Sequence, residues 1–186
     1  MSRQGFKEKM GKTTVRPKDA NIVLIGMPAV GKSTIGVLLA KATSRDFIDT
    51  DVYIQACEGR SLQEIIDREG LEEFCRIETR HVLSLSLSCR GKVMATGGSV
   101  VYSKGAMKHL GSCGVIVHLT LDLPAIKKRL TNLDSRGVVM APGKTLDLLY
   151  EERLPLYRQY ADFTVNCRRK NHEEIVAEII RMVKIP

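Results

Sequence analysis

Short apolar runs alternate with longer stretches of helical periodicity along most of this chain. We predict strands at residues 21–25, 45–49, 92–96, 114–119 and 163–166. We predict helices at residues 33–41, 71–88, 122–130, 146–159 and 172–183, where apolar residues recur every three or four positions. Apolar strands that are separated by helices indicate a parallel β-sheet with helices on both faces. The predicted fold class is therefore α/β.

Helix-capping and helix-breaking residues mark a helical insertion between the second and third predicted strands. Ser61 and Glu64 have the spacing of a capping box, and Gly70 interrupts the helical pattern that follows. Residues 131–145 form a second irregular stretch, which is rich in Asn, Asp, Ser, Gly and Pro and lies between two predicted helices. Because loops of this length often close over a binding site, we expect a lid there.

Residues 25–34 contain a complete phosphate-binding loop, with Gly26, Gly31, Lys32 and Ser33 at the fixed places of G-x-x-x-x-G-K-[ST]. The glycines allow consecutive N–H groups to face phosphate oxygens, the lysine reaches the β- and γ-phosphates, and the serine hydroxyl can bind Mg²⁺. An apolar strand precedes the loop and a helix follows it, which is the context that this motif requires. The chain is therefore predicted to bind a nucleotide.

Length and charge limit the remaining possibilities. The 186 residues suffice for one compact domain, which we expect at residues 20–186, after a basic and flexible tail at residues 1–19. Residues 1–18 hold six Lys or Arg and one Glu, so most of the net charge of +8 lies in this tail. Because Phe6 is the only aromatic residue there, we expect no nucleic-acid partner. No apolar run approaches the length of a membrane span and no secretory signal is evident, so we expect a soluble protein.

The five cysteines, at positions 57, 75, 89, 113 and 167, include no Cys-x-x-Cys pair. A zinc site or a disulfide framework would need paired spacing, so we expect reduced thiols, a cytoplasmic location and no structural metal.

Two acidic and two basic residues are candidates for acceptor chemistry. Asp49 and Asp51 follow a strand and would share one face if the strand continued, but an Asx-turn or a helix N-cap explains the same pattern. Arg76 and Arg158 lie on predicted helices, where an arginine is usually a solvated charge that pairs with its neighbours. These residues alone therefore leave both readings open.

In combination, the motifs resemble those of the shikimate kinase family, from about Asn21 to Ile180. The resemblance rests on residues 26–34, Asp49-Thr50-Asp51, Gly59-Arg60-Ser61, Phe74-Cys75-Arg76-Ile77-Glu78, Gly97-Gly98, Arg136 and Pro155-Leu156-Tyr157-Arg158. It implies a three-layer P-loop fold, with a central five-stranded parallel sheet in the order 2-3-1-4-5. It also implies a helical substrate-binding insertion at about residues 50–90, a lid at about 131–145, and transfer of the ATP γ-phosphate to the 3-hydroxyl of shikimate.

The resemblance also assigns roles to individual residues. It implies nucleotide binding by Gly26, Ala29, Val30, Gly31, Lys32, Ser33, Thr34, Arg129, Arg136 and Lys170. It implies substrate binding by Asp51, Arg76, Gly97, Gly98 and Arg158, in which the two arginines would grip the substrate carboxylate and the two glycines would offer N–H groups. Ser33 and Asp49 would serve Mg²⁺, and Lys32, Asp51 and Arg136 would be catalytic. We expect a monomer.

The chain departs from the family pattern at three points. Thr96 stands where the family usually has the first of three glycines, and Gly137 follows the lid arginine where the family usually has proline. The adenine-contacting arginine of the family aligns with Lys170, next to Arg169. These departures keep two alternatives open, namely a kinase of another small hydroxy acid, such as homoserine or gluconate, and a catalytically silent nucleotide-binding module. The presence of Lys32, Ser33 and Asp51 argues against the silent module.

Overall fold

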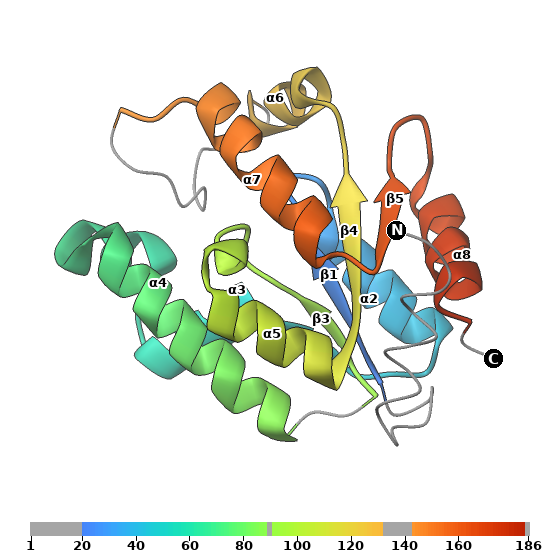
Figure 1. Ribbon diagram of the computed structural model, residues 1–186, viewed down its shortest axis with the longest axis horizontal. Helices are drawn as coiled ribbons and strands as arrows, with labels where there is room; N and C mark the ends of the chain where they lie inside the picture. Colours follow the sequence, from blue (N-terminus) through green and yellow to red (C-terminus); the bar gives the residue numbers. More distant parts are fainter. Residues whose placement is uncertain (1–19, 89–90, 132–142, 185–186) are drawn as a thin grey trace.

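The computed structural model describes residues 20–88, 91–131 and 143–184 of the chain (Figure 1). The strands are β1 (Asn21–Ile25), β2 (Phe47–Asp49), β3 (Val93–Ala95), β4 (Gly114–Thr120) and β5 (Phe163–Asn166). The helices are α2 (Lys32–Ala42), α3 (Thr50–Glu58), α4 (Leu62–Ser88), α5 (Lys104–Cys113), α6 (Leu123–Thr131), α7 (Leu146–Tyr160) and α8 (His172–Val183), with a short 3-10 helix, η1 (Val100–Tyr102). The predicted tail, Arg136 and Gly137 lie outside the described residues.

The five strands form one parallel sheet in the order β2-β3-β1-β4-β5, which confirms the predicted topology. β1 lies at the centre, where Val23 pairs with Met94 of β3 on one side and with Ile116 of β4 on the other. All five residues of β1 are buried, because helices cover both faces of a parallel sheet.

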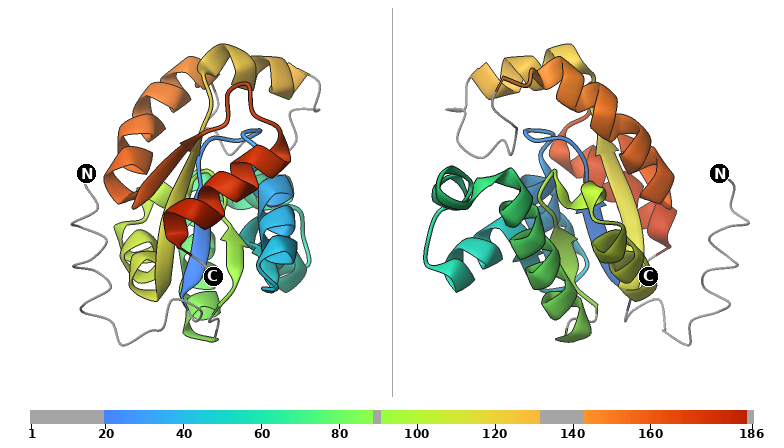
Figure 2. Two further views of the ribbon diagram at one scale, coloured as in Figure 1. Left: turned by 90° about the vertical axis from the view of Figure 1, so that its right-hand side faces the viewer. Right: turned by 60° about the vertical axis from the view of Figure 1, so that its left-hand side comes forward.

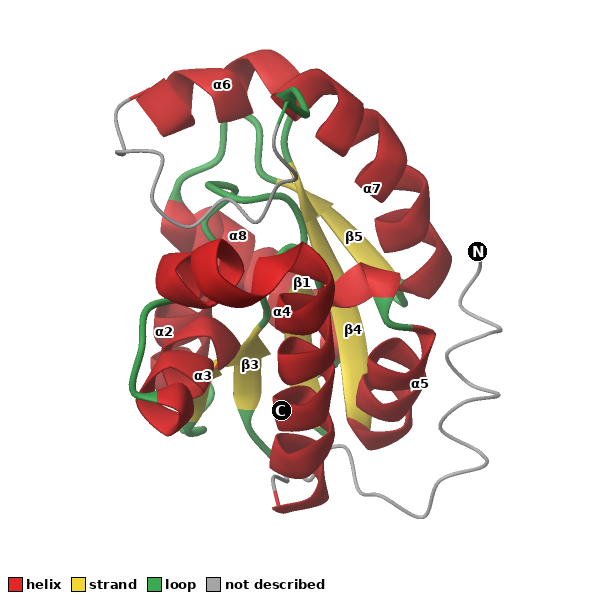
Figure 3. Cartoon of the chain, turned by 90° about the vertical axis from the view of Figure 1, so that its left-hand side faces the viewer, coloured by secondary structure: helices red, strands yellow, loops and turns green. Residues whose placement is uncertain are grey.

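The helices form two layers around the sheet (Figures 1 and 3). Helices α2 and α8 pack together on one face, while α4, α5 and α7 cover the other face. The helical insertion adds a second, smaller core of buried residues between α3 and α4, made of Ile54, Leu62, Ile65, Phe74 and Ile77. The insertion therefore has apolar packing of its own, beside the main core.

The predicted capping box and helix break are confirmed at the start of α4. The N–H of Ser61 donates to Glu64 Oε2 at 2.8 Å, and the N–H of Glu64 donates back to Ser61 Oγ at 3.2 Å. Gly70 has φ 83° and ψ 167°, which kinks the long helix. Two helices were not predicted: α3 begins directly after β2, and α5 follows its N-cap Ser103, whose hydroxyl accepts the N–H of Ala106.

Parallel strands bring their carboxyl ends to one edge of the sheet, and the phosphate loop lies at that edge. Figure 2 shows this loop in blue between β1 and α2, with the helical insertion on one side and α6 and α7 on the other. Within the described part of the chain, no helix has the length and apolar character needed to cross a membrane.

Candidate functional site

The loop between β1 and α2 has the backbone shape that its sequence predicts. Gly26 has φ 147°, and a Cβ at this position would lie 2.4 Å from the carbonyl oxygen of Leu119 in β4. Gly31 has φ 106° and is the N-cap of α2, which has no acidic residue in its first turn. The free N–H groups and the dipole at this helix end favour an anion, so the loop can hold a phosphate group.

Lys32 lies over the loop. Its Nζ donates to the carbonyl oxygens of Gly26 at 2.9 Å and of Met27 at 3.0 Å. Burial lowers the pKa of this lysine to about 8, although the carboxylates of Asp51 and Asp49 oppose the shift. The two residues that follow, Ser33 and Thr34, are exposed at the start of α2. The lysine is thus held close to the position where a bound phosphate would lie.

Arg129, at the end of α6, supports the same loop from the other side. Its Nη1 donates to the carbonyl oxygens of Ala29 at 3.2 Å and of Val30 at 3.0 Å. Lys170 forms an ion pair with Glu178 of α8. Burial raises the pKa of the Cys167 thiol, and the charges of Arg129 and Lys170 both oppose this shift. Arg129 and Lys170 therefore lie near one another at the carboxyl end of β5.

Asp49 ends β2 and begins α3. Its Oδ1 accepts the N–H groups of Asp51 at 3.0 Å and of Val52 at 3.4 Å, so it is the N-cap of α3. The idea that Asp49 and Asp51 share a strand face is wrong, because the chain turns into a helix directly after Asp49. Asp51 instead lies in the first turn of α3, where its Oδ1 is buried and makes no hydrogen bond. Burial raises the pKa of Asp51 to about 6, and Lys32 opposes this shift.

Glu78 of α4 is a second buried carboxyl group, to which sequence analysis assigned no role. It is 2% exposed, and its Oε2 accepts a hydrogen bond from Ser99 Oγ at 2.8 Å. A Cβ at Gly97 would lie 2.3 Å from Glu78 Oε1 and 2.8 Å from Asp51 Oδ1, so these two oxygens face the same small space. Neither oxygen makes a hydrogen bond. Burial raises the pKa of Glu78 to about 8, and the charge of Asp51 adds to the shift.

The segment after β3 crosses between the phosphate loop and α7. The N–H of Gly97 donates to Thr50 Oγ1 at 3.1 Å, so this N–H has a partner within the protein. The hydroxyl of Thr96 donates to the carbonyl oxygen of Leu24 at 3.1 Å, so Thr96 points back into the sheet. A Cβ at Gly98 would lie 3.3 Å from Pro28 of the phosphate loop. Only glycines fit this crossing without displacing neighbours.

Helix α7 holds the Gly97–Gly98 segment from the opposite side. The hydroxyl of Tyr157 donates to the carbonyl oxygen of Gly98 at 2.7 Å, and its ring stacks on His118, with centroids 5.1 Å apart. The side chain of Tyr157 is fully buried, which raises its pKa. Burial also lowers the pKa of His118 to about 4, so the stacked imidazole is neutral at physiological pH.

Arg153 is the second residue that sequence analysis missed. It is 1% exposed, its Nε donates to the Tyr102 hydroxyl at 3.1 Å, and its guanidinium lies 5.0 Å from the centre of the Tyr102 ring. A Cβ at Gly98 would lie 3.0 Å from Arg153 Nη1, so the guanidinium borders the glycine segment. Its spacing of four residues from Tyr157, on one face of α7, is the signal that could have identified it.

Arg76 and Arg158 do not join this cluster. The Arg76 side chain is 67% exposed and pairs with Glu72 at 2.7 Å and Glu73 at 3.0 Å on its own helix. Arg158 is also exposed, because the inward face of α7 at this point belongs to Arg153 and Tyr157. Both arginines therefore lie outside this buried cluster, and their role in gripping the substrate stays a prediction.

The residues predicted to serve Mg²⁺ have oxygen atoms available at the loop. Ser33 is exposed at the start of α2, and both hydrogen bonds to Asp49 are accepted by Oδ1, which leaves Oδ2 for a cation or for its bound water. Among the described residues, no group of three or more His, Cys, Asp or Glu could hold a metal ion. Mg²⁺ bound beside a nucleotide commonly uses one or two protein oxygens together with phosphates and water, so this pair fits such an ion.

The charged groups of the site converge on one place. The pKa of Lys32 responds to Asp51, Arg153, Asp49 and Glu78, which come from α3, α7, the end of β2 and α4. The site can hold phosphates on the loop, offer a carboxylate to a hydroxyl group, and bind a small anion on a buried guanidinium.

Comparison with known proteins gives a consistent result. The family model described as shikimate kinase matches residues 28–184. Shikimate kinase of Caldanaerobacter subterraneus subsp. tengcongensis is 35% identical over 163 residues, which cover 87% of this chain and 94% of that protein. Shikimate kinase of Vibrio parahaemolyticus is 35% identical over 169 residues, which cover 88% of this chain and 96% of that protein. The resemblance that the motifs suggested is therefore confirmed.

Solved structures agree with the sequence comparison. Shikimate kinase from Acinetobacter baumannii in complex with shikimate matches with a TM-score of 0.82 and 25% identity, over 95% of this chain and 97% of that chain. Shikimate kinase from Aquifex aeolicus matches with a TM-score of 0.76 and 30% identity, over 88% of this chain and 96% of that chain.

Glu78→Gln tests the buried carboxyl group. Because the pKa of Glu78 is raised from 4.5 to about 8, the folded protein keeps a proton that the unfolded chain loses in this pH range. The free energy of unfolding should therefore fall as pH rises through this window, and Glu78→Gln should remove that part of the decline. Urea unfolding at pH 5, 6.5 and 8 measures the effect. The exposed Glu151→Gln in α7 is the control, and parallel pH profiles for wild type and Glu78→Gln would contradict the assignment.

Proposed function

The chain belongs to the shikimate kinase family, and from that premise we propose that it transfers the γ-phosphate of ATP to the 3-hydroxyl of shikimate. The observation that carries this proposal is the position of Asp51 and Arg153 opposite the phosphate loop. A carboxylate faces the place where a hydroxyl must attack, and a buried guanidinium lies beside it for the carboxylate of the substrate.

The donor half of the reaction would use the phosphate loop. The N–H groups at the start of α2 bind phosphate oxygens, and the ammonium group of Lys32 stabilises the negative charge of the transferred phosphoryl group. Arg129 keeps the loop in shape through the carbonyl oxygens of Ala29 and Val30. In this proposal, Arg136 contacts the phosphates and Lys170 contacts adenine.

The acceptor half would be built around Asp51. With a pKa of about 6, its carboxylate is charged at neutral pH and is close to the basicity at which a general base works well. Its buried Oδ1 accepts the proton of the attacking hydroxyl. Arg153 binds the carboxylate of shikimate, which is the role predicted for Arg76 and Arg158. Because Gly98 has no side chain, the shikimate ring can approach the backbone at this residue.

Mg²⁺ would be held by Ser33, and by Asp49 through water. When bound there, the ion would supply positive charge that offsets the negative charge developing during transfer. Asp49 accepts two N–H groups through one oxygen, so it can serve the ion without giving up its cap of α3.

We also propose a monomeric, cytoplasmic enzyme. Both halves of the site come from one chain, which supports the monomer. The free thiols of Cys57, Cys75, Cys113 and Cys167 suit a reducing compartment.

Measurement of ADP release tests the function. Purified protein with Mg-ATP should release ADP in the presence of shikimate, but not with homoserine or gluconate at equal concentration. Lys32→Ala should lower kcat by about 100-fold or more, because it removes a cation that stabilises the transferred phosphoryl group. If none of the three acceptors stimulates ADP release, the chain is not an active kinase of this class. Turnover with homoserine or gluconate alone would reject shikimate as the acceptor.

Arg153→Lys compared with Arg76→Ala tests which arginine binds the acceptor. Lysine keeps the charge but loses the paired N–H donors of guanidinium, so Arg153→Lys should raise the KM for shikimate by about tenfold or more. Arg76→Ala should leave this KM within about twofold, because an exposed pair on one helix contributes little. The KM for ATP should stay unchanged in both variants. The reverse ranking of the two variants would restore the role first expected of Arg76.

Tyr157→Phe tests the support of the glycine segment. Loss of its hydrogen bond leaves the Gly98 carbonyl without that donor, and we expect the KM for shikimate to rise about fivefold, from a loss of about 1 kcal/mol. Tyr150→Phe is the matched control, because Tyr150 lies on the same helix and its hydroxyl donates to the Leu121 carbonyl at 3.4 Å. Thermal stability can fall in both variants. An equal rise of the KM in both would show that Tyr157 acts only through stability.

A further inference from the structure

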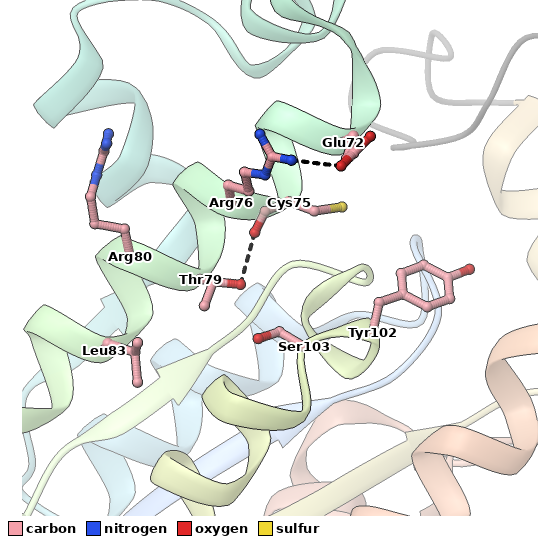
Figure 4. A pocket seen from close by; sticks show the side chains of 8 residues that line it. All are labelled: Glu72, Cys75, Arg76, Thr79, Arg80, Leu83, Tyr102 and Ser103. Carbon is pink, nitrogen blue, oxygen red and sulfur yellow. Dashed lines mark hydrogen bonds and ion pairs between the residues drawn. The ribbon is translucent and has the colours of Figure 1, made fainter.

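Cys75 of helix α4 faces the acceptor side of the site. Arg76, its neighbour, points to Glu72, while the half-buried thiol of Cys75 points to the side on which Tyr102 stands (Figure 4). The helical turn explains this arrangement, because Phe74 and Ile77 are buried in the insertion core and leave Arg76 on the solvent side. In this turn of α4, it is therefore the Cys75 thiol that points toward the side of Tyr102.

A pocket of about 660 Å³ lies between α4 and the segment that contains η1 and the start of α5. Tyr102 and Ser103 line it from one wall, and the other wall consists of α4 residues, namely Glu72, Cys75, Arg76, Thr79, Arg80 and Leu83. The two arginines of this wall form ion pairs with Glu72, Glu73 and Glu58. Thr79 turns its hydroxyl to the carbonyl oxygen of Cys75 at 2.8 Å, so its polar atom is engaged within the helix. The space in front of the thiol is large enough for part of a small molecule.

Two contacts connect this pocket with the buried charges of the site. Tyr102 lines the pocket and also accepts the hydrogen bond from Arg153, whose guanidinium lies over its ring. Burial raises the pKa of the Cys75 thiol, the charge of Glu78 adds to that shift, and Arg153 opposes it. Cys75 therefore lies within the electrostatic reach of the groups that surround the acceptor, in addition to facing the pocket.

We propose that Cys75 is a specificity-determining residue of the acceptor site, an inference that rests on the function proposed above. Its thiol lines the pocket across from Tyr102, whose ring lies against the Arg153 guanidinium, so that Arg153 holds the carboxylate of the acceptor and the thiol adds no second charge beside it. The thiol and the Tyr102 ring leave room beside this carboxylate. Affinity for a carboxylated acceptor is therefore set by Arg153 and limited by the absence of charge at position 75.

Cys75→Arg tests this inference directly. A second guanidinium opposite Arg153 should lower the KM for shikimate by about tenfold, because hydrogen bonds between charged groups are stronger than neutral ones. The KM for ATP should not change. Cys57→Arg is the control, because it places the same new charge on an exposed position of α3.

Alkylation of the thiol provides an independent readout. Shikimate at saturating concentration should slow the reaction of Cys75 with iodoacetamide at least fivefold, as measured by peptide mass spectrometry, and should leave that of exposed Cys57 unchanged. An active enzyme whose Cys75 is not protected, and whose KM is not lowered by Cys75→Arg, would overturn the inference while the proposed function stands.

If wild type does not phosphorylate shikimate, the proposed function fails and calorimetric binding decides the inference. Shikimate binding that is at least tenfold tighter in Cys75→Arg than in wild type would still support it. Equal or undetectable binding in both proteins would overturn it.

Discussion

The structure depends on charged side chains that lie close together where the sheet ends, two of which, Arg153 and Glu78, are fully buried. Lys32 and Arg153 bring positive charge to this place, while Asp51 and Glu78 bring carboxyl groups. An isolated buried charge destabilises the folded state, so each of these groups requires an opposite charge nearby. The helices and strands that carry them must therefore end close together in space. The parallel topology meets this need, because β1, β2 and β3 end at the same edge and α7 crosses above it.

The glycine segment after β3 is the point at which these groups meet. Side chains at positions 97 and 98 would displace the two carboxyl groups on one side and Arg153 on the other. Thr50 and Tyr157 fix the backbone here with hydrogen bonds from opposite sides, so the segment is positioned without side chains of its own. The same absence of side chains that permits the buried cluster leaves space for a substrate ring. Packing and function therefore impose the same requirement on these two residues.

The sequence was sufficient to predict features whose information is local. The phosphate loop, the capping box at Ser61 and the kink at Gly70 each depend on a few adjacent residues, and the strand order followed from the family resemblance. The arginines were different, because a helix shows its inward face only when its packing partner is known. In α7 the buried stripe is Leu149, Arg153 and Tyr157, and an arginine in such a stripe is normally taken for a surface residue.

The two halves of the site differ in the same way. The donor half is one continuous segment, and its chemistry can be read from a motif. The acceptor half is assembled from α3, α4, the glycine segment and α7, which are far apart in sequence, so each residue looks ordinary where it stands. Tyr102 belongs to no recognisable motif, yet its ring lies against the buried guanidinium of Arg153 and lines one pocket together with Cys75. Selectivity for the acceptor can therefore change through single substitutions in these walls, while the phosphate loop and the fold stay the same.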